Sequence, residues 1–310
     1  MKLVFCGTPE FAVPSLQAVI HAGHEVALVL TQPDRPAGRK LELQVSPIKQ
    51  LALSLGLPVA QPDKLKTNAE LRAQLESIAP DAIIVVAYGR ILPDWMLVLP
   101  RFGCINVHGS LLPKYRGAAP IQWAIANGET ETGITTMRLD AGLDTGDTLL
   151  SHSLPIGPHT TSAQLYPQLA QLGGQLLVET LSGLATGTLT LTAQDNAQAT
   201  LAPILTRDDG RLDPAHTAQQ AYNRWRGFSP WPGCWATFRS KRFLIHALHP
   251  ATAGPALAPG ELDNSTGALL AGAAQGTILS LDEVQLEGKP RLPGAQFARD
   301  FQLRPGEHLD

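Results

Sequence analysis

Residues 1–109 alternate continuous apolar runs with stretches of helical periodicity, and this alternation restricts the fold more than any other feature of the sequence. Runs rich in Val and Ile along their whole length predict strands that are buried on both faces. Such strands, connected by helices, form parallel sheets, so we expect a doubly wound α/β domain. The predicted strands are residues 2–7, 25–32, 81–88 and 101–109, and the predicted helices are 9–22, 47–55 and 69–78.

A second domain follows from the length and from a change in composition. The 310 residues suffice for two cores. A long apolar-periodic helix at 161–184 is followed by a Thr/Ala/Gln-rich stretch, and the chain beyond it consists of short runs separated by Gly and Pro. We therefore predict an α/β domain at 1–187, a linker at 188–206, and a small β-barrel of the oligonucleotide-binding (OB) type at 207–310.

Several classes of protein are disfavoured by what the sequence lacks. The first predicted strand leads into G-T-P-E rather than G-x-G-x-x-G, and no phosphate-binding G-x-x-x-x-G-K-[ST] motif occurs. No apolar run approaches the ~20 residues of a membrane span, so we expect a cytoplasmic protein with no membrane partner. Cys6, Cys104 and Cys234 are too widely spaced for a metal site, and we expect free, buried thiols.

Three polar residues near the ends of predicted elements form a candidate reaction centre. Asn106 and His108 are two residues apart at the end of a strand, so their side chains point to the same face. The Gly-punctuated loop 140–147 can bring Asp144 to that imidazole. Each residue also has a structural interpretation, as a turn former or a core histidine. Spacing alone leaves the reaction open.

A family resemblance narrows these alternatives. The segments INVHGSLLPKYRGAAPIQWAI and ETGITTMRLDAGLDTGD (105–125 and 131–147) resemble the signature of the folate-dependent formyltransferases. The resemblance implies a Rossmann-like domain, 10-formyltetrahydrofolate as co-substrate and no metal. It also implies that Asn106 stabilises the oxyanion, that His108 transfers protons, and that Asp144 orients the imidazole, directly or through a water. The implied folate-binding residues are Tyr88, Gly89, Arg90, Ile91, Leu92, Ser110, Leu111, Leu112 and Pro113.

Four segments, one of them the end of the signature at 105–125, resemble the branch of that family that formylates methionyl-tRNA. They are GTPEFAVPSL, TQPDRPAGR, RGAAPIQWAI and GFSPWPGCW. The resemblance therefore implies formyl transfer to methionyl initiator tRNA in support of translation initiation, and we expect a monomer.

The net charge of −3 requires any nucleic-acid contact to be local. Residues 207–242 contain seven basic and three acidic residues, a balance of +4. Solvated surface charge is the alternative explanation, and residues 41–45 lack the further basic residues usual in the family. The candidate tRNA contacts are Arg35, Arg39, Lys40, Arg207, Arg211, Arg239, Lys241 and Arg242.

Two other functions remain open from the sequence. An enzyme of the same family could hydrolyse the formyl group or transfer it to a small-molecule amine. A protein that had lost catalysis could act as a nucleic-acid-binding module. Neither alternative explains the sequence as fully, because the first leaves the basic second domain unused and the second leaves Asn106, His108 and Asp144 unused.

Overall fold

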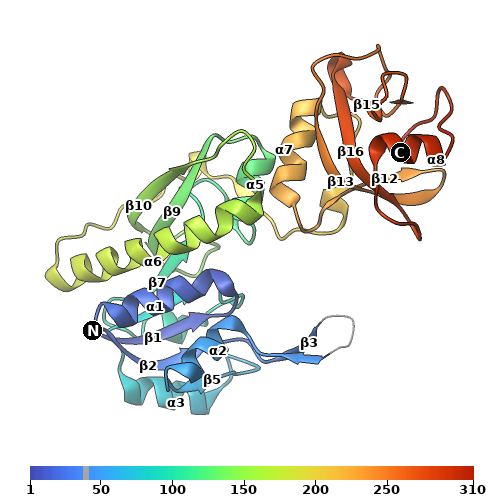
Figure 1. Ribbon diagram of the computed structural model, residues 1–310. Coiled ribbons are helices and arrows are strands. Elements are labelled where there is room, and N and C mark those ends of the chain that lie inside the picture. The colour runs from blue at the N-terminus through green and yellow to red at the C-terminus, as the bar shows by residue number, and fades with distance from the viewer. Residues whose placement is uncertain (38–41) are drawn as a thin grey trace. The chain divides into compact units, whose positions relative to one another are not determined.

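The computed structural model describes residues 1–37 and 42–310, which divide into two compact units (Figure 1). The first contains Met1–Pro120, Glu131–Pro155 and Leu165–Pro203, and the second contains Ile121–Thr130, Ile156–Gln164 and Ile204–Asp310. Each unit is made of three separate stretches of chain, whereas each predicted domain, 1–187 and 207–310, is a single continuous stretch. Those boundaries stay a prediction.

A seven-stranded sheet forms the centre of the first unit, in the order β10-β9-β7-β6-β1-β2-β5. The strands from β7 to β5 are parallel, as predicted, and β9 and β10 add an antiparallel edge that the sequence analysis did not include. The bounds are β1 (Lys2–Gly7), β2 (Glu25–Leu30), β5 (Val59–Ala60), β6 (Ala82–Val86), β7 (Cys104–His108), β9 (Glu131–Arg138) and β10 (Thr148–Pro155).

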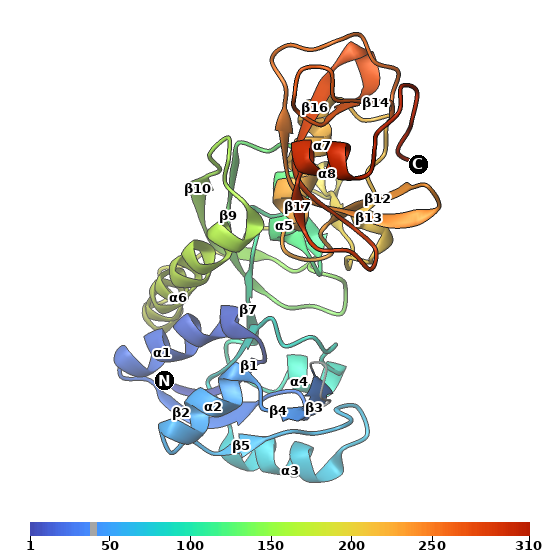
Figure 2. The same cartoon turned by 45° about the vertical axis from the view of Figure 1, so that its right-hand side comes forward.

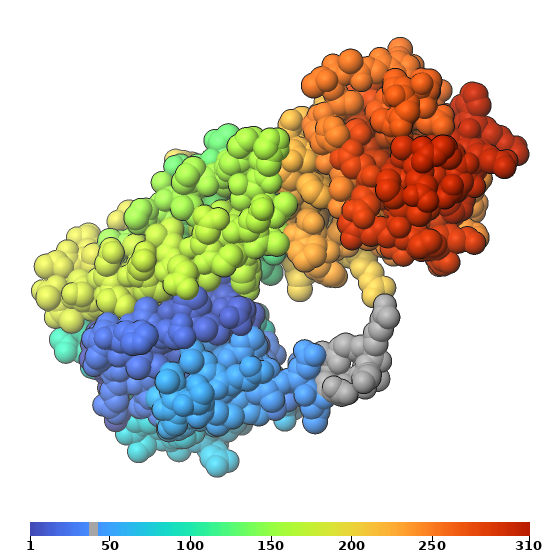
Figure 3. Space-filling model, in the orientation of Figure 1, coloured from blue at the N-terminus to red at the C-terminus, as the bar shows by residue number. Residues whose placement is uncertain are grey.

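Helices cover both faces of this sheet. On one face α6 packs against α1 (Figure 3). A methyl group on Gly174 of α6 would lie 3.3 Å from the Ala18 side chain of α1. On the other face Leu71 and Leu75 of α3 join the core with Val4 and Ile83. The bounds are α1 (Val13–His21), α2 (Pro47–Ser54), α3 (Ala69–Ile78), α4 (Asp94–Leu97), α6 (Ser162–Thr186) and the 3-10 helices at Glu10–Ala12 and Asn196–Gln198.

Local chemistry sets the ends of these helices. The Asn68 side chain accepts a hydrogen bond from the Leu71 amide, so α3 begins where its cap predicts. The predicted end of α6, at residue 184, is two residues too early. The helix continues to Thr186 and stops before Gly187, whose φ of +68° is left-handed, whereas Gly183 makes room for Leu189.

Short strands complete the first unit. β3 (Arg35–Ala37) pairs with β4 (Glu42–Gln44), which is labelled in Figure 2. β8 (Arg116–Gly117) pairs in parallel with β11 (Leu201–Ala202). The second pairing ties the predicted linker to the strand that follows the His108 loop.

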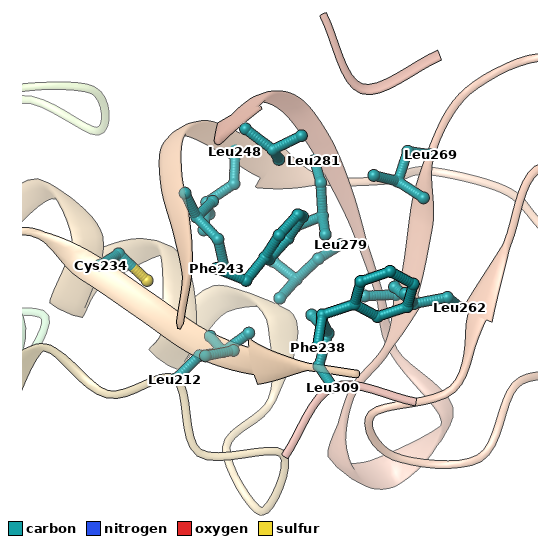
Figure 4. Close-up of a cluster of buried hydrophobic side chains, with 14 of the residues drawn as sticks. Leu212, Cys234, Phe238, Phe243, Leu248, Leu262, Leu269, Leu279, Leu281 and Leu309 are labelled. Atoms are coloured by element: carbon teal, nitrogen blue, oxygen red, sulfur yellow. The ribbon is translucent and has the colours of Figure 1, made fainter. Parts of the chain in front are cut away.

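The second unit is built on an antiparallel sheet in the order β12-β13-β16-β15-β14, with β17 paired to β16. Its core contains Phe238, Phe243 and Leu281, which point toward one another between the sheet and its helices (Figure 4). The bounds are α5 (Pro120–Ala126), α7 (Ala218–Phe228), β12 (Cys234–Phe238), β13 (Lys241–Pro250), β14 (Leu262–Asp263), β15 (Leu270–Gly272), β16 (Ile278–Leu286), β17 (Leu292–Pro293), α8 (Gly294–Asp300) and the 3-10 helices at Asp208–Gly210 and Ala274–Gly276.

Helix α7 begins at Ala218. Thr217 caps it and forms a capping box with Gln220, which fixes the first turn at Ala218. At the other end, the buried Arg226 donates hydrogen bonds to the carbonyls of Gly157 and Thr160. The segment 156–164 is thus fastened to α7 within the second unit.

Candidate active site

Asn106 and His108 lie at the carboxyl end of β7 on the same face of the sheet. They pair with Met137 and Thr135 of β9 and are only 8% and 5% exposed. The prediction that these two side chains point to the same face is therefore consistent with the register of β7 and β9. Among the described residues, none hydrogen-bonds the Asn106 side chain, which leaves its amide free to donate to a ligand.

The imidazole of His108 is fixed by a backbone carbonyl. Its Nε2 atom lies 2.9 Å from the carbonyl oxygen of Tyr115. A carbonyl only accepts, so Nε2 carries a hydrogen in either protonation state. Nδ1 is therefore the ring atom that can gain or lose a proton. The Tyr115 backbone is left-handed, with φ of +62°, and turns its carbonyl toward the ring.

Asp144 is the acidic residue of the 140–147 loop that approaches this imidazole. Its Oδ2 atom lies 3.7 Å from Nδ1 of His108, and both side chains are largely buried. This distance suits an ion pair but exceeds a direct hydrogen bond. The same oxygen accepts a hydrogen bond of 2.9 Å from the Gly117 amide, which holds the carboxylate in place.

The two other aspartates of the loop have different roles. Asp140 accepts hydrogen bonds from the Gly142 amide and the Thr145 hydroxyl, so it shapes the turn. Asp147 lies 3.7 Å from Arg138 at the surface. The choice of Asp144 among the three is therefore consistent with the structure.

Buried hydroxyls shape the loop that follows His108. Thr135 donates to the Ser110 carbonyl at 2.8 Å and accepts from the Leu112 amide at 3.1 Å. Ser110 itself is fully buried and donates to the Lys114 carbonyl. The Leu112–Pro113 peptide is cis. These bonds give 110–113 a defined backbone beside the imidazole.

In the other predicted folate-binding segment, residues 88–92, some side chains are buried in the core and others are exposed. The Tyr88 side chain belongs to the core, and its carbonyl accepts hydrogen bonds from Thr8 and Gln32. Ile91 is 92% exposed, and Arg90 donates to the Asp63 carbonyl. Backbone and exposed atoms of 89–92 therefore remain candidates for ligand contact, whereas the Tyr88 ring is committed to packing.

The segment predicted to be a linker contributes to the site, which the sequence analysis did not foresee. Nε2 of Gln194 donates to the carbonyls of Asp144 and Gly146 at 2.9 and 2.7 Å. Arg116 in turn donates to Gln194. No local sequence signal marks Gln194, because its partners are far away along the chain.

Both parts of the chain match known protein families. Residues 1–181 match the model of the Formyl transferase family, and residues 204–302 match that of its C-terminal domain. The chain belongs to the formyl transferase family. The predicted fold class, an α/β formyltransferase domain followed by a separate β domain, is confirmed.

Curated relatives in this family match along their whole length. A protein of Acidobacterium capsulatum named methionyl-tRNA formyltransferase is 58% identical, over 100% of this chain and 99% of its own. One of the same name from Koribacter versatilis is 57% identical, over 100% and 98%. Identity of this extent shows that the chain is a formyltransferase.

Two solved structures share the fold at low identity. The N-formyltransferase of Helicobacter canadensis has a TM-score of 0.67 at 17% identity, covering 91% of this chain and 98% of its own. HypX of Aquifex aeolicus, solved with tetrahydrofolic acid, has a TM-score of 0.61 at 16% identity, covering 97% and 47%.

The basic residues predicted to contact tRNA differ in their surroundings. Arg35 is exposed on β3, and Arg39 and Lys40 lie outside the described residues. In the second unit, Arg207 and Lys241 are exposed. Arg211 and Arg242 lie over the Trp235 ring, at 5.9 and 4.3 Å from its centre.

Arg239 is more constrained than these. It donates to both carboxylate oxygens of Glu307, at 2.6 and 2.8 Å, and to the Phe301 carbonyl. Bonding to Arg239 lowers the pKa of Glu307 from its ordinary value. The charge of Arg239 is thus neutralised within its own unit, which makes it a weaker candidate for phosphate contact than Arg242.

Residues 1–37 and 42–310 show neither a metal site nor a membrane span. No group of three or more His, Cys, Asp or Glu side chains is placed to bind a metal there. No helix in that part of the chain is long and apolar enough to cross a bilayer. All three cysteines are free and buried, as predicted, and burial raises the pKa of Cys104 and Cys234 to about 12.

Proposed function

We propose that this formyltransferase transfers the formyl group of 10-formyltetrahydrofolate to the α-amine of methionyl initiator tRNA, a step of protein biosynthesis that prepares translation initiation. The observation that carries the proposal is the placement of Asp144 3.7 Å from His108 beside Asn106 in β7. The full-length identity with proteins named methionyl-tRNA formyltransferase supports the choice of acceptor.

Asn106 is the proposed oxyanion donor. Attack of the amine on the formyl carbon develops negative charge on the formyl oxygen. An amide that has no hydrogen-bond partner within residues 1–37 and 42–310 and is only 8% exposed can meet that charge without prior rearrangement. Removal of one such donor costs about 2.7–4 kcal/mol of transition-state stabilisation in other enzymes.

His108 is the proposed proton carrier, acting through Nδ1. Because Nε2–H is held by the Tyr115 carbonyl, the neutral ring presents its lone pair at Nδ1. Nδ1 takes a proton from the attacking amine and returns it toward the departing N10 nitrogen of the folate. The carboxylate of Asp144 stabilises the imidazolium formed between these steps.

The folate is proposed to lie along 110–113 and 89–92, where backbone donors and acceptors suit a pterin. Support comes from the fixed backbone beside His108 and from the tetrahydrofolic acid bound by the HypX relative. The acceptor RNA is proposed to contact Arg35, Arg39 and Lys40 and the basic surface at 207–242. We further propose that the enzyme is a cytoplasmic monomer whose domains divide near residues 187 and 207.

Competition between acceptors tests this function. Labelled formyl is supplied as 10-formyltetrahydrofolate to the full chain, with methionyl initiator tRNA, free methionine and water as acceptors. Formyl-methionyl-tRNA as the dominant product supports the proposal. Free formate alone would indicate a hydrolase, and formylmethionine from the free amino acid would indicate a small-amine transferase.

A further inference from the structure

The side chain of Gln194 binds the backbone of the loop that carries Asp144. The Gln194 amide nitrogen donates to the Asp144 and Gly146 carbonyls, at 2.9 and 2.7 Å. Asp144 adopts a left-handed conformation, with φ of +52°, which is unfavourable for a residue other than Gly. The two hydrogen bonds secure the loop where its backbone is least favourable.

Arg116 determines which way the Gln194 amide points. Nε and Nη2 of Arg116 lie 3.0 and 2.8 Å from Oε1 of Gln194. A guanidinium can only donate, so this end of the amide is the oxygen, and both hydrogens of Nε2 face the Asp144 loop. Each end of the amide thus meets partners of the right kind.

The backbone around Gln194 is itself anchored on both sides. Thr192 exchanges two hydrogen bonds of 2.9 Å with Thr148, just after the Asp144 loop. Leu201 and Ala202 pair with β8, whose Gly117 amide binds the Asp144 carboxylate. Arg116 is only 7% exposed and also donates to Asn196. The segment 192–202 therefore spans the two pieces of chain that hold Asp144.

From this arrangement we propose that Gln194 is a positioning residue for the reaction, acting through Asp144. It fixes the Asp144 backbone from behind while Gly117 fixes the carboxylate, so that the carboxylate stays directed at Nδ1 of His108. The effect of this role on catalysis rests on the proposed function. A displacement of about 1 Å in a catalytic group can lower the rate by roughly 10²-fold.

Gln194→Glu is the discriminating variant, and Gln198→Glu is its matched control. The glutamate at 194 keeps an acceptor for Arg116 but replaces the two donors with an oxygen that faces two carbonyls. Gln198 lies in the same segment, is exposed, and bonds to Asp195 instead. Both variants add the same charge. Gln194→Ala, which removes the donors without adding charge, serves as a second test.

The variants are compared by formyl transfer to methionyl-tRNA and by amide hydrogen exchange of residues 140–147. We expect Gln194→Glu and Gln194→Ala to lower kcat by about tenfold or more, with little change in KM, and to speed exchange of the loop. Gln198→Glu should match the wild type in both. On an Asp144→Asn background, the Gln194 substitutions should lower kcat little further, because the group they position has already been neutralised.

Several results would overturn the proposal. One is a Gln194 variant whose kcat and loop exchange equal those of Gln198→Glu. Another is an undiminished effect on the Asp144→Asn background, since that would indicate a general structural role. Wild-type protein without any formyl transfer would reject the proposed function instead, and hydrogen exchange would then still decide whether Gln194 holds the loop.

Discussion

Oδ2 of Asp144 lies 3.7 Å from Nδ1 of His108 in a largely buried setting. At this separation the carboxylate attracts a protonated imidazole electrostatically, but the two groups do not share a short hydrogen bond. The geometry favours an electrostatic role for Asp144, because Nδ1 stays available to the substrate while its protonated form is stabilised.

The variant Asp144→Asn tests that electrostatic role. It keeps the size of the side chain and an oxygen for the Gly117 amide but removes the charge. We expect kcat to fall by roughly tenfold or more. Asp147→Asn is the matched control, since Asp147 also lies 3.7 Å from its cation, Arg138, but at an exposed site where ion pairs contribute little. Steady-state kinetics with equal effects for both variants would contradict the role.

Gly117 is predicted to be intolerant of a side chain. Its φ is +122°, and a Cβ atom would lie 2.6 Å from the Ala202 carbonyl oxygen in the paired strand β11. Gly117→Ala should lower the free energy of unfolding by about 2–4 kcal/mol through strain and displacement of β11. Gly187→Ala, with φ of +68° and open space, should cost only about 1 kcal/mol. Chemical denaturation of both variants measures the difference.

Glu307 should make the second unit sensitive to acid. Its pKa is lowered from the ordinary 4.5, chiefly by hydrogen bonding to Arg239. A depressed folded-state pKa contributes stability above the unfolded value, and that stability is lost as the pH falls through the folded value. Glu307→Gln should therefore be less stable than wild type near pH 7, with the gap in unfolding free energy closing as the pH falls below the ordinary 4.5 and through the lowered pKa of Glu307. A gap in urea unfolding that is independent of pH would contradict this.

Salt dependence separates the basic residues of the second unit. Arg242→Gln should weaken binding of methionyl-tRNA and reduce the slope of log K against log salt by about 1. Arg239→Gln should change that slope less, because Glu307 already neutralises the charge. Filter binding at several salt concentrations measures both, and equal slopes for the two variants would argue against the distinction.

Features set by local chemistry could be predicted from the sequence. Helix α3 occupies the predicted residues 69–78, because Asn68 caps it and its apolar residues recur with helical period. Strand β1 also matches its predicted 2–7, since every residue after Lys2 is apolar and buried. By contrast, β10 exposes Ser151, His152 and Ser153 in succession and gives little strand signal at the edge of the sheet.

Features that depend on contacts distant in the sequence could not be predicted. Gln194 binds Asp144, Gly146 and Arg116, which are 50, 48 and 78 residues away. Its surroundings are Thr- and Ala-rich and resemble an ordinary linker. The Gly-punctuated loop 140–147 made Asp144 a candidate partner of His108, but the choice of a reaction for the pair depended on the family resemblance, because neither residue has a local pattern that names its role.

The most direct test of the mechanism is single-turnover formyl transfer to methionyl initiator tRNA by His108→Ala, with His152→Ala, an exposed histidine of β10, as control. Tetrahydrofolate binding to both variants checks that the pocket is intact. We predict a transfer rate lower by about 10²–10⁴ for His108→Ala and no change for the control. If His108→Ala transferred formyl as fast as His152→Ala, proton transfer through Nδ1 would be excluded as the basis of catalysis.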